Sequence, residues 1–175
     1  MTGFYCHSAR GQYQHGIGLV ESMIVVAIVV ILASFAVPAF TAYVDNYRVK
    51  AVSEAIYADL QYGRSMAIKN NANVYFSMAS SCWGMNYSVS CDCATANSCA
   101  IKSTSAADYI VQSISPSVTS TYITGTRGMA DGGAATVTIT SKLGKITQVG
   151  LSKIGRVFIC STNSGASYVY DYPAC

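Results

Sequence analysis

Histidine, cysteine and acidic side chains are the residues of this 175-residue chain that are most able to do chemistry. Both histidines, His7 and His15, lie in the first 16 residues, and the rest of the chain has none. Because histidine is the commonest general base, that remainder is poorly suited to Ser-His or Cys-His catalysis. The acids are scattered, and no glycine-rich phosphate loop precedes a helix. We therefore expect no enzyme activity, no cofactor and no small-molecule substrate.

The cysteines predict disulfides rather than a metal site. Four of them follow one another at spacings of nine, two and six, which do not match the closely spaced cysteine pairs of structural zinc sites. If the apolar segment before them crosses a membrane, they reach an oxidising compartment, whereas Cys6 stays on the reducing side. The sequence leaves the pairing open among six candidates: Cys82, Cys91, Cys93, Cys99, Cys160 and Cys175.

The apolar segment has a single acid at its edge. Residues 22–44 include no charged side chain, and Glu21 immediately precedes them. As a helix, these residues would rise about 34 Å, enough to cross a hydrocarbon core of roughly 30 Å. A secretory signal peptide has a much shorter apolar core. A plain membrane anchor has no use for a carboxylate that is costly to bury unpaired.

A third interpretation gives Glu21 a role in assembly. If the chain is cut after Gly16, Ile17 becomes a positively charged N-terminus four residues before Glu21. In a bundle of parallel helices, the carboxylate could pair with the N-terminus of a neighbouring subunit and fix the axial register. The two buried charges would then neutralise one another.

Gly16, the following IGLVE and the apolar run together resemble the signal of type IV prepilins and type II secretion pseudopilins. The resemblance implies that prepilin peptidase cuts between Gly16 and Ile17 and that Ile17 is N-methylated, although the family usually has Phe there. It implies assembly roles for Glu21 and for Pro38, which matches the family's helix-softening proline. It also implies a bacterial inner-membrane precursor with one membrane pass and a cytoplasmic N-terminus, and later a place in a periplasmic or cell-surface pilus with other major and minor pilins.

The helical pattern continues past Pro38 and becomes amphipathic. We predict one helix over residues 18–70, about 80 Å long, which Pro38 bends or locally melts because it lacks an N–H and its ring clashes with the preceding turn. Charged residues such as Asp59 fall largely off the apolar stripe. Residues spaced three and four apart predict that stripe, which is to be buried: Val49, Val52, Ile56, Leu60, Gly63 and Ala67.

Short segments rich in β-branched and aromatic residues follow the helix and predict strands. The fold class is therefore α+β: a type IV pilin-like fold, with a long N-terminal helix packed against an antiparallel β-sheet head that carries disulfides. The segments are NVYFSMA, MNYSV, DYIVQSI, STYITG, ATVTIT, RVFIC and SYVYDY.

The stretch GRSMAIKNNANV narrows the resemblance to the minor pilins FimT and FimU and the pseudopilin GspH. In these proteins an AR-x-x-AI signature precedes a strand, and Gly63 stands here where alanine is commoner. CWGMNY is similar to the Trp-Gly turn that follows the family's first strand. The resemblance also implies a Cys160–Cys175 disulfide that ties the C-terminus to RVFIC.

Residues 142–156 carry four cations and no acid: Lys142, Lys145, Lys153 and Arg156. One interpretation is a solvated face. The other is a patch that binds DNA phosphates without reading bases, with a log–log salt slope of about −3.6 for four contacts. FimT-type minor pilins bind DNA during natural transformation, with a G-R-x-R motif near the C-terminus. Gly155 and Arg156 match this motif, but Phe158 replaces its second arginine.

The sequence thus predicts four segments: a leader that is removed (1–16), the membrane and assembly half of the helix (17–44), its amphipathic half (45–71) and a β-rich head (72–175). The predicted function is that of a minor pilin that assembles into or at the tip of a pilus and supports its biogenesis. One alternative is a DNA-binding minor pilin for DNA uptake, and a further alternative is a type II secretion pseudopilin of the GspH kind.

Overall fold

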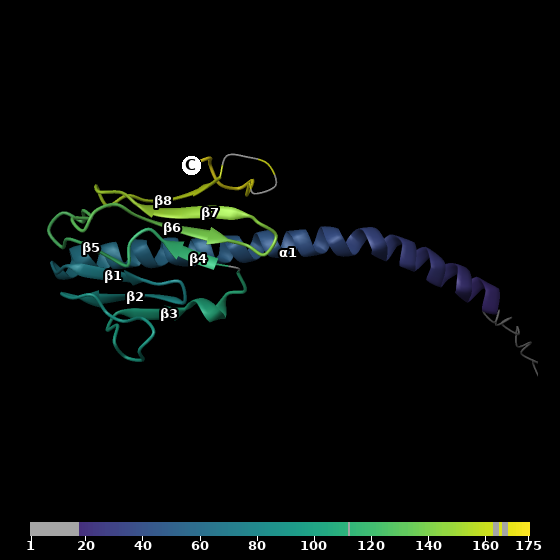
Figure 1. The fold of residues 1–175 in the computed structure, drawn as a ribbon, viewed down its shortest axis with the longest axis horizontal. Coiled ribbons are helices and arrows are strands. Elements are labelled where there is room, and N and C mark those ends of the chain that lie inside the picture. Colours follow the sequence, from purple (N-terminus) through teal and green to yellow (C-terminus); the bar gives the residue numbers. More distant parts are fainter. Residues whose placement is uncertain (1–17, 112, 163–164, 166–167) are drawn as a thin grey trace, which may run out of the picture. The chain divides into compact units, whose positions relative to one another are not determined.

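The computed structural model describes residues 18–111, 113–162, 165 and 168–175, in two units that divide after Ala39 (Figure 1). Helix α1 (Leu19–Asn70) begins in the first unit and ends in the second. We predicted that Pro38 bends or locally melts the helix; the backbone stays helical through Pro38, so the helix does not melt there. The predicted helix, residues 18–70, agrees with these bounds to within one residue.

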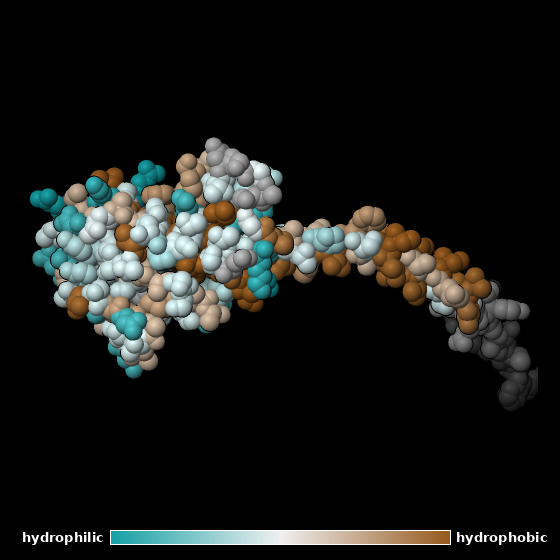
Figure 2. All heavy atoms as spheres, in the orientation of Figure 1, coloured by the Kyte–Doolittle hydropathy of each residue, from teal (hydrophilic) through white to brown (hydrophobic). Residues whose placement is uncertain are grey.

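The first unit is apolar and exposed. Each of residues 19–39 is exposed, and hydrophobic residues predominate along this part of the helix (Figure 2). By length and composition, α1 could cross a membrane. A side chain such as Phe35, 74% exposed, would not remain in water, because transfer of apolar surface out of water is favourable. This part of the helix therefore requires either lipid or other protein around it.

In the second unit, α1 packs against two four-stranded antiparallel sheets (Figure 1). The first sheet has the order β3-β2-β1-β5 and the second the order β4-β6-β7-β8. The strands of the first sheet are β1 (Val74–Met78), β2 (Cys82–Tyr87), β3 (Lys102–Ser105) and β5 (Ser120–Ile123). Those of the second are β4 (Ser113–Pro116), β6 (Ala135–Thr140), β7 (Ile146–Leu151) and β8 (Val157–Ser161).

The predicted stripe on α1 is confirmed, because all six of its residues are buried. Gly63 is required there for close packing: a Cβ at this position would lie 2.2 Å from Cζ of Phe76 on β1. In β6, buried and half-buried residues alternate, as expected for a strand with one face on the core. Ala135, Val137 and Ile139 supply its buried face.

The observed strands differ from the predicted segments at several places. The predicted DYIVQSI overlaps strand β4 only in Ser113 and Ile114. CWGMNY, which is similar to the family's Trp-Gly turn and of which only MNY stood in a predicted strand, is strand β2 throughout. Its register with β1 pairs Trp83 with Met78. ITQVGL, which was not among the predicted segments, is strand β7 at the centre of its sheet. The described part of SYVYDY forms no strand and contributes the buried Val169.

Asp59 also differs from the expectation, because it is 6% exposed and faces the core. Its carboxylate accepts a hydrogen bond from Trp83 Nε1 at 2.9 Å and one from Lys102 Nζ at 2.6 Å. Burial of a carboxylate is tolerated when it is paired and hydrogen-bonded. Asp59 thus fixes the indole of Trp83 and links α1 to strands β2 and β3.

We expect Asp59→Ala to lower the free energy of unfolding by about 2–3 kcal/mol, because the buried Trp83 N–H loses its acceptor. Lys102→Ala should cost less, about 1 kcal/mol, since the Lys102 side chain is 47% exposed and Trp83 still holds the carboxylate. Chemical unfolding of the detergent-solubilised chain measures both. Equal losses in the two variants would contradict the dominant role of the indole.

Candidate functional site

Glu21 lies in the first turn of α1. An acid there interacts favourably with the positive end of the helix dipole, but this gain is small compared with the cost of burying an unpaired carboxylate. None of the described residues forms an ion pair with Glu21. Gly16 and Ile17, the predicted cleavage and methylation site, lie outside the described residues.

The hydroxyl groups of Ser22 and Ser34, in the first unit, are satisfied by the helix itself. Ser22 Oγ donates to the carbonyl oxygen of Leu19 at 2.7 Å, and Ser34 Oγ donates to that of Ile31 at 2.6 Å. Such bonds remove the need for a water or protein partner in lipid. Glu21 is therefore the residue of this surface that still needs a partner from outside the described chain.

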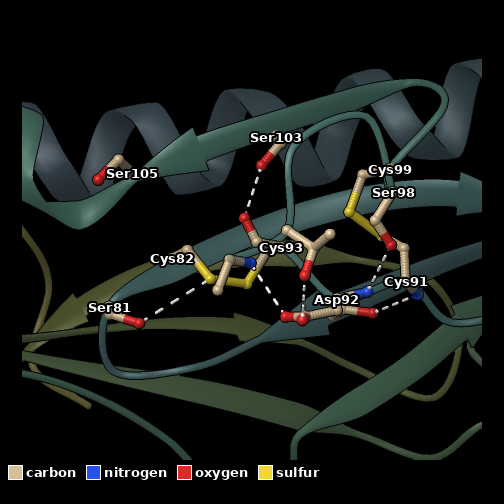
Figure 3. The surroundings of a disulfide bond; sticks show 12 residues. Ser81, Cys82, Cys91, Asp92, Cys93, Ser98, Cys99, Ser103 and Ser105 are labelled. Carbon is tan, nitrogen blue, oxygen red and sulfur yellow. Dashed lines mark hydrogen bonds between the residues drawn. A yellow bond between two sulfur atoms is a disulfide. The ribbon is translucent and has the colours of Figure 1, made fainter.

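The cysteines at positions 82–99 form two disulfides: one connects the loop between β2 and β3 to the first sheet, and the other lies within that loop (Figure 3). Cys82 on β2 is bonded to Cys93, and Cys91 is bonded to Cys99. Within the loop, hydrogen bonds from Thr95 and from the Ala94 N–H lower the pKa of the exposed Asp92 carboxyl. These bonds stabilise a loop that has little apolar content, and the described residues contain no group of side chains suited to hold a metal ion.

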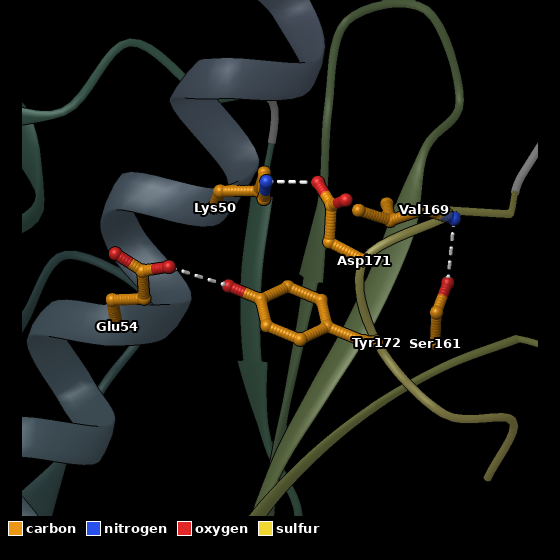
Figure 4. A network of polar contacts seen from close by, with 6 residues as sticks. All are labelled: Lys50, Glu54, Ser161, Val169, Asp171 and Tyr172. Carbon is orange, nitrogen blue, oxygen red and sulfur yellow. Dashed lines mark hydrogen bonds and ion pairs between the residues drawn. The ribbon is translucent and has the colours of Figure 1, made fainter.

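The C-terminal residues are fastened to the second sheet and to α1 (Figure 4). A disulfide joins Cys175 to Cys160 on β8. Asp171 forms an ion pair with Lys50 of α1, and the hydroxyl of Tyr172 donates to Glu54 at 3.1 Å. Burial, and secondarily the charge of Glu54, raises the pKa of the Tyr172 phenol above its usual value. The neutral phenol is therefore the donor, and the C-terminus is held at several points.

The four cations of the basic run do not form one patch. Lys142 and Lys145 lie at the turn between β6 and β7, whereas Lys153 and Arg156 lie at the turn between β7 and β8. The six residues of β7 separate the two pairs by about 20 Å. Lys145 is also engaged within the head, because its Nζ donates to the carbonyl oxygen of Tyr168 at 2.8 Å.

The structure brings two further arginines to the β7–β8 turn. Arg64 of α1 donates through Nε to the carbonyl oxygen of Gly128 at 3.2 Å, next to the exposed Arg127. The loop between β5 and β6, called here the Gly128 loop, contacts the turn directly. The N–H of Ala130 in this loop donates to the carbonyl oxygen of Lys153 at 3.0 Å. We call this group the basic cluster: Arg64, Arg127, Lys153 and Arg156.

Three cations of the basic cluster are exposed, and Arg64 is half-buried. Asp131, also exposed, is the acid nearest to Arg127 in the sequence.

Arg64 and Arg127 were not predicted from the sequence, because they come from segments about 60 residues apart and neither stands in a run of cations. The glycines that surround Arg127 in TGTRGM were the available signal, since they permit the close approach of two loops.

A long helix with an apolar beginning, an antiparallel β head and a disulfide-linked C-terminus define a type IV pilin-like protein. The fold is similar to the crystal structure of the type IV minor pilin FimU of Pseudomonas aeruginosa, with a TM-score of 0.52 and 14% identity over 72% of this chain and 95% of that chain. A second crystal form of FimU gives a TM-score of 0.48 and 18% identity over 68% and 94% of the two chains. At such identities, the similarity concerns the fold alone.

The family follows from the sequence comparison. A family model described as type II transport protein GspH matches residues 52–170, which is more than half of the chain. The chain therefore belongs to the GspH family. Proteins of this family and fold are structural subunits that assemble with other pilins, and they are not enzymes. No curated protein matches the chain. The predicted fold class and the predicted family are thus confirmed.

Proposed function

We propose that this protein is a minor pilin that enters a type IV pilus, within the filament or at its tip, and supports its assembly. The observation that carries the proposal is the isolated Glu21 on an exposed apolar helix. In a bundle of such helices the apolar residues are buried, and each carboxylate needs a cationic partner. Cleavage after Gly16 supplies this cationic partner: the new N-terminus of a neighbouring subunit, at the same level along the filament axis as Glu21.

The proposed sequence of events begins in the inner membrane, which holds the precursor through the apolar half of α1. Prepilin peptidase removes residues 1–16 and Ile17 is methylated. The helix then leaves the lipid for the filament, where it exchanges lipid contacts for contacts with other pilin helices. The transfer changes the apolar burial little, because lipid and pilin helices are similarly apolar. The charge pair therefore favours the filament over the membrane.

Gly16→Leu tests the maturation step. We expect the variant to accumulate as an uncut precursor in the membrane, whereas Gly18→Ala, two residues further on, should be processed, since a Cβ there meets nothing within 4 Å. Intact-mass measurement distinguishes a chain that begins at Ile17 from one that retains the leader. Processing of Gly16→Leu at the normal position would contradict the assignment.

The family description also supports a role in a different filament, the pseudopilus of type II secretion. The same helix, charge pair and maturation would serve both systems, because the fold itself specifies no cargo. Deletion of the gene separates the two alternatives. A pilus subunit is expected to be required for surface pili, and a pseudopilin for secretion of exoproteins.

The basic cluster favours DNA binding as a second candidate function. If each of its four cations contacts one phosphate, the logarithm of the affinity for duplex DNA should fall with the logarithm of salt at a slope of about −3.6. Binding should be independent of sequence, since contacts to phosphate carry no base information. The half-matched G-R-x-R motif contributes Arg156 to the same cluster.

Arg127→Ala/Lys153→Ala is expected to weaken DNA binding and to reduce the slope to about −1.8, because two phosphate contacts are lost. Lys142→Ala/Lys145→Ala removes the same charge at the other end of β7 and should leave the slope unchanged. Gel shifts of the detergent-solubilised chain at several salt concentrations measure both. Equal weakening by the two double variants would point to net charge rather than the basic cluster.

A further inference from the structure

Strand β8 forms one edge of the second sheet (Figure 1). Two backbone bonds flank the pairing of β7 with β8: the Ser152 N–H donates to the carbonyl oxygen of Arg156, and the Thr162 N–H donates to that of Ile146. With the register of the two strands, these bonds show which residues of β8 form hydrogen-bonded pairs with β7, since such pairs alternate in antiparallel strands. The peptide groups of Phe158 and Cys160 therefore face β7. Those of Val157 and Ile159 face outward, and no described residue hydrogen-bonds to them. Edge strands with such groups accept an added strand.

The chain already uses this edge at its other end. Ser161 also faces outward, and its N–H donates to the carbonyl oxygen of Pro173 at 2.8 Å while its carbonyl oxygen accepts the N–H of Cys175 at 3.0 Å. This parallel bridge between Ser161 and Ala174 covers the end of β8. An extended segment thus fits the edge. The backbone groups of the two outward-facing residues before Ser161 have no hydrogen-bond partner among the described residues, while the side chain of Val157 is part of the buried core.

A groove of about 650 Å³ lies beside the open part of the edge. Ile154, 66% exposed, and the ring of Phe158 give it an apolar surface. Phe158 is positioned by a glycine: a Cβ at Gly150 would lie 2.2 Å from Cζ of its ring. Pro173 borders the groove where the C-terminal residues begin to cover β8. An apolar side chain of an added strand could therefore be buried in this groove.

The charge of the groove indicates the chemistry of its occupant. Arg156 lines the groove, and Lys153 precedes it in the same turn. None of the described residues that line the groove has an acidic side chain. The end of the groove near Ile154 is thus cationic, which favours an acidic partner and disfavours a second copy of this same turn.

We propose that the β8 edge and this groove bind an extended segment of another pilin-type subunit, one that carries an apolar side chain and an acidic side chain. Val157 and Ile159 supply two N–H and two C=O groups for backbone bonds, the groove holds the apolar side chain, and Arg156 pairs with the acid. This inference rests on the proposed function as a filament subunit, and it assigns the surface by which the head contacts its neighbour.

A photoreactive benzoylphenylalanine at position 154 of the full chain tests the proposal in isolated filaments. We expect a cross-link to an acidic segment of a different pilin-type subunit, identified by sequencing the linked peptide. Presence of the protein in filaments without such a cross-link, or a cross-link to a second copy of this chain or to lipid, would overturn the inference and leave the proposed function intact. Absence from filaments would overturn both.

Two pairs of variants separate the parts of the proposed contact. Arg156→Glu should lower the cross-link yield at least about tenfold, whereas Lys142→Glu, at the other end of β7, should leave it unchanged. Ile159→Pro removes an outward N–H that β7 does not use and should abolish the cross-link, whereas Ile159→Ala should retain it. Undiminished cross-linking in both Arg156→Glu and Ile159→Pro would contradict strand addition. Unfolding measurements establish that each variant is folded.

Discussion

Glu21→Ala should leave the protein folded and inserted in the membrane but reduce its incorporation into filaments by at least about tenfold, because removing one member of a buried ion pair costs about 3–5 kcal/mol. The head does not depend on Glu21, since the buried core residues all come from residues 49–169. Membrane insertion should not decrease, because the apolar helix loses its one charge. The expected loss therefore concerns assembly alone, and the ratio of protein in sheared filaments to protein in membranes measures it.

Two matched variants sharpen this test. Glu21→Gln keeps the size and the hydrogen-bonding capacity of the side chain but not its charge, and it should fail almost as severely as alanine if the pair is ionic. Ser22→Ala removes a hydroxyl whose bond is local, to the carbonyl oxygen of Leu19, and it should assemble normally. Wild-type incorporation of Glu21→Ala would exclude a register role for the carboxylate.

Gly155→Ala should lower the free energy of unfolding by about 3–5 kcal/mol, the largest effect that we expect from a single methyl group in the head. Gly155 has a φ of +77°, a backbone conformation that costs about 1–2 kcal/mol for alanine. A Cβ there would also lie 1.8 Å from the carbonyl oxygen of Gly128, so one of the two backbones must move. The displaced Gly128 loop carries Arg127, so the variant should also weaken DNA binding.

Gly144→Ala is the matched control for this substitution. Gly144 is in the turn between β6 and β7 and has a φ of +80°, but a Cβ there meets nothing within 4 Å. The control should thus lose only the conformational cost of about 1–2 kcal/mol. Chemical unfolding of the oxidised chain in detergent compares the two. Equal destabilisation would show that the two loops do not constrain one another.

The sequence was sufficient to predict the helix and its buried stripe, because both depend on local spacing. Strand β6 was equally clear, since its alternation reflects one buried and one half-buried face. Strand β7 was missed because Gly150 interrupts its apolar pattern, and β3 because its residues, Lys102–Ser105, are polar and largely exposed at an edge. The burial of Asp59 was not predicted, because the two residues that hydrogen-bond to its carboxylate, Trp83 and Lys102, are distant in the sequence.

In the candidate site, too, local features could be predicted from the sequence and contacts between distant segments could not. Glu21 was evident, because a single acid beside an uncharged run is a local feature. The basic cluster was not evident, because the linear run 142–156 includes two of its four cations and two lysines that lie at the other end of β7. The approach of Gly128 to Gly155 assembles the cluster, and contacts between segments so distant in sequence leave no periodic signal. The pairing of the four cysteines at positions 82–99 was open for the same reason, whereas the Cys160–Cys175 bond that the family resemblance implies is present.

The most direct test of the assembly account is to shear filaments from cells that express the wild-type chain and to measure the intact mass of this protein in the filaments and in the membranes. The account predicts a filament-associated species that begins at Ile17, N-methylated, with its six head cysteines oxidised. It would be contradicted if the mature protein were found in the membranes alone while filaments of normal composition form without it.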